Sequence, residues 1–86
     1  RDVSLLVPKG TPAAAVEAEI RRLAGDFLWD VRLFDVYEGE SIPEGHRSLA
    51  FSVAYRSAER TLSDEEIEGR HGALRSGLAA RGYTLR

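Results

Sequence analysis

Hydrophobic and polar residues alternate most clearly in the middle of the chain, where two strands are predicted to form a hairpin. The second of these strands has one face of large apolar side chains and one face of small side chains, because side chains alternate across a strand. The two faces are Leu49, Phe51, Val53 and Tyr55, and Ser48, Ala50, Ser52 and Ala54. A strand that only needs solvating usually carries charged or long polar side chains outward. A row of Ser and Ala lets another molecule come close to the backbone, so this face is suited to binding a flat ligand.

The same pattern predicts two further strands and a first helix. The strands are expected at residues 2–8, 27–37, 47–56 and 83–86. The helix is expected to begin at Thr11 and Pro12, with Thr11 as N-cap and Pro12 at the first helical position. Apolar residues then recur with helical spacing at Val16, Ile20 and Leu23. Gly25 is well placed to end this helix.

A second helix is predicted from Ser63 to Gly82. Ser63 and Glu66 form a capping-box pattern, and the acidic residues at 64–66 favour the positive end of a helix. Three glycines at positions 69, 72 and 77 cost roughly 1 kcal/mol each in a helix relative to alanine. We expect close packing against the sheet at one of them, or fraying of the helix. The loop at 38–46 is expected to be too polar to bury.

The element order is therefore β-α-β-β-α-β. Two right-handed crossovers that share one hairpin give a four-stranded antiparallel sheet with both helices on one face. The expected fold class is α+β, a ferredoxin-like sandwich formed by one domain over residues 1–86. The second face of the sheet is expected to be bare, and the row of small side chains should lie on it.

Composition narrows the possible functions. The formal net charge of −2 argues against a generally basic nucleic-acid binder, but it leaves binding through one local basic face open. The chain has no Cys, so no disulfide, thiolate metal site or iron–sulfur cluster is expected. No apolar run approaches the length of a membrane span. The absence of Cys, Met, Asn and Gln fits a thermophilic source or GC-rich codon usage. Because the chain also starts at Arg1, we interpret it as part of a longer protein.

A bare four-stranded sheet is a platform on which unpaired bases can stack, although the same fold carries several other functions. An acylphosphatase needs an Asn to orient its attacking water, and a copper carrier needs a Cys pair; both residue types are absent. The RNA-recognition motif needs outward aromatic residues on its third strand, whereas Phe51 and Tyr55 point inward here. A regulatory domain of the same topology, which senses an amino acid and dimerises through its sheet, remains an alternative.

Several segments at compatible spacing resemble one known family. The chain resembles the C-terminal anticodon-binding domain of the bacterial phenylalanyl-tRNA synthetase beta subunit over essentially its whole length. The segments that carry the resemblance are RDV at 1–3, VRLFDVY at 31–37 with Gly39, Gly45 with SLAF at 48–51, RTLSDEE at 60–66 and LR at 85–86. The family often has two lysines before the serine, and His46 and Arg47 stand there in this chain. Arg47 keeps a positive charge, and His46 carries one only when it is protonated.

The resemblance implies a non-catalytic domain that binds the anticodon stem-loop of tRNA(Phe). It implies, as partners, the rest of the beta subunit and an alpha subunit in a cytoplasmic heterotetramer, with no membrane contact. ATP and magnesium would belong to the parent enzyme, and no cofactor or metal is expected in this domain. The candidate RNA-binding residues are Tyr37 for stacking, Ser48, Ala50 and Ser52 for close contact with bases, and Arg32, Arg47, Arg56 and Arg86 for phosphates.

Other polar and aromatic residues are expected to be structural. Asp35 is expected to bond backbone or arginine groups near the hairpin, and Arg60 to support the start of the second helix. Trp29 is expected to pack or to lie at a domain contact. His71 is expected to be packed rather than to bind a metal, because the only other histidine lies in a distant loop.

Overall fold

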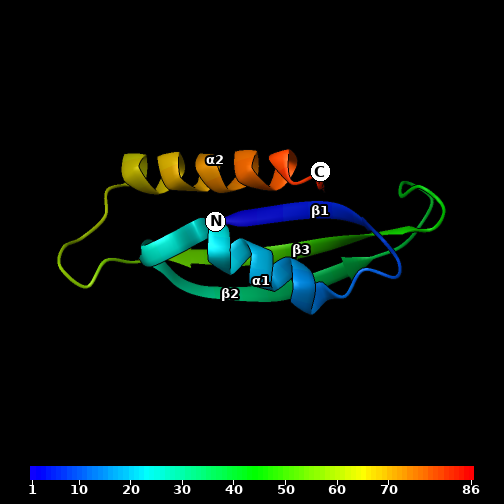
Figure 1. Ribbon diagram of the computed structural model, residues 1–86, viewed down its shortest axis with the longest axis horizontal. Coiled ribbons are helices and arrows are strands. Elements are labelled where there is room, and N and C mark those ends of the chain that lie inside the picture. The colour runs from blue at the N-terminus through cyan, green and yellow to red at the C-terminus, as the bar shows by residue number, and fades with distance from the viewer.

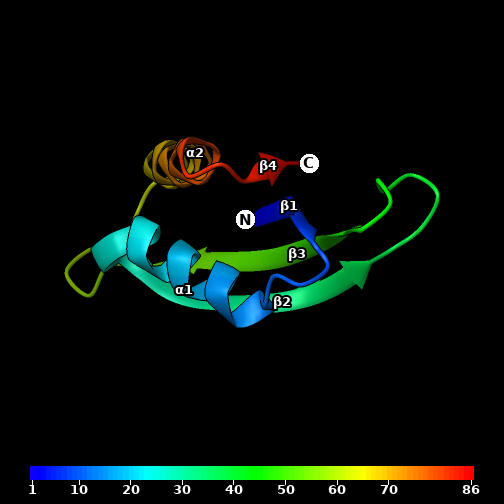
Figure 2. The ribbon, with the colours of Figure 1, turned by 45° about the vertical axis from the view of Figure 1, so that its right-hand side comes forward.

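The computed structural model describes residues 1–86 and confirms the ferredoxin-like fold. The element order is β1 (Asp2–Pro8), α1 (Ala13–Ala24), η1 (Gly25–Phe27), β2 (Leu28–Tyr37), β3 (His46–Tyr55), α2 (Asp64–Ala80) and β4 (Thr84–Leu85). The four strands form one antiparallel sheet in the order β2-β3-β1-β4. Figure 1 shows α1 crossing the sheet and α2 running along β1, and Figure 2 shows α2 nearly end-on at the far side of the molecule from β2.

A single core of 11 buried residues lies between the sheet and the helices. Val3, Leu5 and Val7 enter it from β1, and Leu49, Phe51 and Val53 enter it from the opposed positions of β3. Full burial of an aliphatic or Phe side chain is worth roughly 1.5–3 kcal/mol. The residues of this core come from β1, β2, β3, α1 and α2, so every long element contributes to it.

The two helices begin differently. The N-cap of α1 is Pro12, and no side chain caps this end, so the prediction of Thr11 as N-cap was wrong. The end of α1 at Gly25 is confirmed, and this glycine has a φ of 70°. The capping box of α2 is confirmed: the Glu66 amide donates to Ser63 Oγ at 3.1 Å, and the Ser63 amide donates to Glu66 Oε1 at 3.2 Å.

One helical glycine marks a close approach between the helices. A Cβ at Gly77 would lie 3.1 Å from Cδ2 of Leu23 on α1, whereas Gly69 and Gly72 have nothing within 4 Å. Close packing occurs at one of the three glycines, but the predicted partner was wrong, because Gly77 packs against the other helix and not against the sheet.

The edge strand β2 is interrupted twice. Its pairing with β3 shifts register between Leu28 and Asp30 and again between Leu33 and Asp35, which leaves Trp29 and Phe34 as the extra residues. A β-bulge of this kind takes a side chain out of the regular alternation. Trp29 and Phe34 are both exposed as a result, with Trp29 at 63%.

The molecule is elongated, with extents of 45 × 20 × 18 Å. The loop between β2 and β3 and the loop between β3 and α2 project at opposite ends of the long axis (Figure 1). No helix has the length and apolar character that a membrane span requires.

Candidate nucleic-acid interface

The strand register defines the sheet face that the helices leave uncovered. Ser48 lies between Tyr37 of β2 and Leu6 of β1, and Leu6 in turn pairs with Thr84 of β4. Ala50 lies between Asp35 and Ser4 in the next row. The predicted row of small side chains is therefore on the face opposite to Leu49 and Phe51, as the alternation indicated.

This face is not bare at the Ser48 end. The Arg86 amide donates to the Ser4 carbonyl at 2.8 Å, which anchors Arg86 beside β1. The guanidinium carbon of Arg86 lies 5.8 Å from the centre of the Tyr37 ring. Tyr37 and Arg86 start from opposite edges of the sheet, three strand spacings or about 14 Å apart. Their side chains therefore meet over β3 and β1, and we call this pair the Tyr37–Arg86 bridge.

Near the bridge, the small residues Ser48 and Ala50 are less exposed than a bare sheet face would leave them. Ser48 is only 4% exposed and Ala50 only 8%. The prediction that Ser48 is exposed on an open face was wrong. A small side chain between taller neighbours is shielded, and here Ser48 has Tyr37 on one side and Leu6 on the other.

The loop between β2 and β3 belongs to the same end of the face. Residues 38–41 and 43–45 of this loop are exposed, as predicted, but Ile42 is buried outside the main core, so the prediction was wrong at this residue. Its amide donates to the Gly39 carbonyl at 3.0 Å. Nη2 of Arg86 lies 3.5 Å from Oγ of Ser41. Arg86 thus contacts both the Tyr37 ring and the loop that follows it.

Further along the face the side chains are more accessible. Ser52 is half-buried between Arg32 and Asp2, and Arg32 is exposed. The acidic side chains Asp2, Asp30 and Asp35 share this face with Arg32 and Arg86. Asp35 is exposed and its carboxylate forms none of the side-chain hydrogen bonds or ion pairs of the structure, which does not fit its predicted structural role. The face therefore carries both signs of charge around a floor of small neutral side chains.

The structure separates the other two candidate arginines from this group. Nη2 of Arg47 donates to the Thr11 carbonyl at 2.8 Å, and Arg47 shares the helix-side face with Leu49. Arg56 lies at the far end of β3, with its guanidinium carbon 4.4 Å from the centre of the Trp29 ring. Tyr37, Ser48, Ala50, Ser52, Arg32 and Arg86 are therefore the candidates that share one face.

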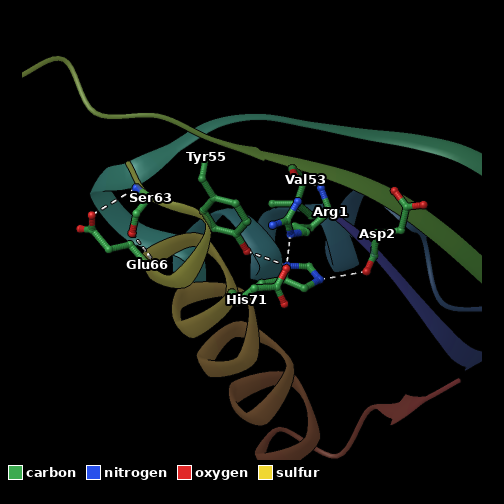
Figure 3. Close-up of polar contacts among 8 residues, drawn as sticks. Arg1, Asp2, Val53, Tyr55, Ser63, Glu66 and His71 are labelled. Carbon is green, nitrogen blue, oxygen red and sulfur yellow. Dashed lines mark hydrogen bonds and ion pairs between the residues drawn. The ribbon is translucent and has the colours of Figure 1, made fainter. Parts of the chain in front are cut away.

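His71 is packed, as the sequence indicated. Figure 3 shows its ring between Tyr55 and the backbone of Asp2. The Asp2 carbonyl can only accept, so Nε2 donates to it at 2.9 Å, and Nδ1 accepts from the Tyr55 hydroxyl at 2.8 Å. Burial raises the pKa of Tyr55 to about 12. These contacts fasten α2 to β1 and β3.

Arg60 also has the structural role that was expected of it. Its guanidinium donates to Glu66 Oε1 at 2.7 Å and so contacts the acid of the capping box. This hydrogen bond is the main reason why the pKa of Glu66 falls to about 2, and the amide of Ser63 adds to the effect.

Sequence reasoning missed four residues at the Tyr37 end: Leu6, Gly39, Ile42 and Thr84. Leu6 and Thr84 could have been found by writing out the antiparallel register, since both pair across the sheet in line with Ser48. Gly39 was named only as part of a family segment. Neither its contact with Tyr37 nor the burial of Ile42 could be read from the register, because both depend on how the loop folds.

Comparison with known proteins agrees with this geometry. The family model of the ferredoxin-fold anticodon binding domain matches residues 1–86, and the chain belongs to this family. Its relatives include phenylalanine–tRNA ligase beta subunits. That of Symbiobacterium thermophilum is 50% identical over 86 residues, which are all of this chain and 10% of the relative. Those of Moorella thermoacetica and Shouchella clausii are 45% identical over 87 residues and 52% identical over 74 residues, covering 100% and 86% of this chain and 11% and 9% of the relatives. The chain spans about a tenth of the length of these relatives.

Proposed function

We propose that this domain binds the anticodon stem-loop of tRNA(Phe) on the face of the sheet opposite to the helices. The observation that carries the proposal is the row of small side chains from Ser48 to Ser52 on that face, in a chain that the anticodon-binding family matches from end to end. Unpaired bases can lie flat on such a floor, stack on aromatic rings and form hydrogen bonds through their edges.

The residues on this face would contact different parts of the RNA, according to their chemistry. Tyr37 is 42% exposed and offers an aromatic ring. The Ser48 hydroxyl can donate to or accept from a base edge once the bridge above it moves aside. Arg32 and Arg86 carry the positive charge that phosphates need, and a guanidinium plane can also stack on a base. Arg47 and Arg56 lie away from this group and would contact RNA only if the stem-loop extends past the ends of the sheet.

We place the domain in a larger enzyme. The relatives described above are beta subunits of phenylalanine–tRNA ligase about ten times its length. In such a cytoplasmic ligase the domain would hold the tRNA, while the rest of the beta subunit and an alpha subunit in a heterotetramer would carry the chemistry. ATP and magnesium would act there and not in this domain. With a net charge of −2, the isolated domain should bind RNA weakly.

An NMR titration of the ¹⁵N-labelled 86-residue chain tests the proposal. A hairpin with the phenylalanine anticodon should shift the amide signals of Tyr37, Ser48 and Ala50, and added salt should weaken the binding because phosphate contacts release counterions. The control is a hairpin with the same stem and a different anticodon, which should bind less well. The absence of any shift with RNA, together with a shift on adding free phenylalanine, would contradict anticodon binding and favour an amino-acid-sensing domain.

A further inference from the structure

Gly39 faces the Tyr37 side chain and has no room for a side chain of its own. A Cβ built on Gly39 would lie 2.8 Å from Cζ and 3.3 Å from Cε2 of Tyr37, and closer still to the Tyr37 hydroxyl. Favourable contacts between carbon atoms occur at about 3.5–4.0 Å. Any side chain at position 39 would therefore push the end of the Tyr37 ring away.

The backbone does not explain this glycine. Gly25, Gly45 and Gly82 have positive φ values, and Gly39 does not. An L-residue can therefore adopt the backbone conformation of Gly39 without strain. The requirement for glycine comes from the space that Tyr37 occupies.

The Tyr37 ring is also held from across the sheet. The Arg86 guanidinium lies within the range of a cation–π contact with the ring, and Arg86 is anchored by its backbone to Ser4. The Tyr37 side chain thus has the Gly39 backbone near its hydroxyl end and Arg86 near its ring, in the row that contains Ser48. A side chain that is already ordered loses less conformational freedom when a ligand binds.

We propose that Gly39 is a positioning residue for RNA binding, which acts by letting the Tyr37 ring lie against the loop, where the ring stays when a base takes the place of Arg86. This inference rests on the proposed function, because it assigns a role to Gly39 at the same face. It predicts that a methyl group at position 39 disturbs the ring without unfolding the domain.

Gly39→Ala tests the inference against Gly10→Ala as a matched control. Gly10 lies in a turn, has no atom within 4 Å of an added Cβ and has no positive φ. In the free protein, Gly39→Ala should shift the ring signals of Tyr37 and the Nε signal of Arg86, and Gly10→Ala should leave both in place. Gly39→Ala should weaken binding of the anticodon hairpin by about 2- to 10-fold, in line with the ordering of one side chain. Gly10→Ala should leave it unchanged.

A double-mutant cycle separates positioning from a general effect on the loop. If Gly39 acts through Tyr37, then Gly39→Ala should have no further effect on hairpin binding in a Tyr37→Ala background. An added loss in that background would overturn the inference, and so would unchanged Tyr37 ring signals in Gly39→Ala. If the wild-type domain does not bind the hairpin at all, the proposed function fails instead, and the ring signals still report on the contact between Gly39 and Tyr37.

Discussion

The guanidinium carbon of Arg86 lies 5.8 Å from the centre of the Tyr37 ring, although the two residues belong to opposite edges of the sheet. The contact lies on the face that no helix covers, where Ser48 beside Tyr37 is only 4% exposed. A cation–π contact at an exposed site is worth about 0.5–1 kcal/mol, whereas stacking of a base on an aromatic ring is worth about 1–3 kcal/mol. A base can therefore compete with Arg86 for the Tyr37 ring.

Ser48→Glu should destabilise the domain, because Ser48 is only 4% exposed and a longer side chain has to displace the Tyr37–Arg86 bridge. The expected loss in the free energy of unfolding is about 2 kcal/mol, as for other side chains that are too large for their site. Ala54→Glu is the control, since Ala54 belongs to the same row and is exposed. Because Asp30 lies opposite Ala54, repulsion between the two acids should cost about 1 kcal/mol or less. Equal urea midpoints for the two variants would show that Ser48 is not shielded.

Tyr55→Phe should lower the free energy of unfolding by about 1–2 kcal/mol, because it leaves buried His71 Nδ1 without a donor. Tyr83→Phe is the matched control, since the Tyr83 hydroxyl takes part in none of the hydrogen bonds of the structure and its ring is half-buried. Urea denaturation of both variants measures the difference. Equal stabilities would mean that the hydrogen bond between Tyr55 and His71 contributes nothing.

The same tyrosine predicts a loss of stability at high pH. Its pKa is about 12 in the folded state and 10.0 as the ordinary value, so the folded state holds its proton more tightly. The resulting stabilisation is complete below pH 10 and declines as the pH rises towards 12. Phenolate absorbance should show one tyrosine that ionises near pH 12 in the wild type. If the high-pH titration of Tyr55→Phe still contains that step, the assignment to Tyr55 is wrong.

Glu66 predicts a loss of stability in acid. Its pKa is about 2 in the folded state against an ordinary value of 4.5, so its contribution is present above pH 4.5 and is lost as the pH falls towards 2. Glu66→Gln cannot ionise and should reduce the slope of stability against pH in this window. Thermal unfolding of both proteins from pH 5 to about pH 2 checks the prediction. Parallel acid profiles would contradict it.

The helical glycines predict opposite responses to a methyl group. Gly72→Ala should stabilise the domain by about 0.5–1 kcal/mol, because the site is open and alanine is the better helix former. Gly77→Ala should gain less or lose stability, since its Cβ would press on Leu23. The melting temperatures of the two variants are compared. A larger gain for Gly77→Ala than for Gly72→Ala would contradict the prediction, because it would mean that α1 moves aside without loss of stability.

Much of the fold could be predicted because local signals agree with one another. The alternation at 48–55 assigned the faces of β3 correctly, and the pattern of Ser63 and Glu66 gave the start of α2. The segments around residues 31–37, 48–51 and 60–66 gave the family, which the comparison confirms.

The shape of the candidate site could not be predicted in the same way, because it depends on contacts between distant residues. Tyr37 and Arg86 are 49 positions apart in the sequence and meet only when β2 and β4 take opposite edges of the sheet. The two bulges of β2 change which side chains are exposed, and no periodicity reveals them. Burial of Ile42 likewise depends on the fold of its loop.

The most direct test of anticodon binding at the Tyr37 end compares two exposed aromatic residues on the same strand. Tyr37 and Trp29 lie at opposite ends of β2, and both are well exposed. The dissociation constant of the phenylalanine-anticodon hairpin should rise about 5- to 150-fold in Tyr37→Ala, as expected for loss of one stacked base. It should stay unchanged in Trp29→Ala. Unchanged affinity in Tyr37→Ala, or a larger loss in Trp29→Ala, would contradict the account.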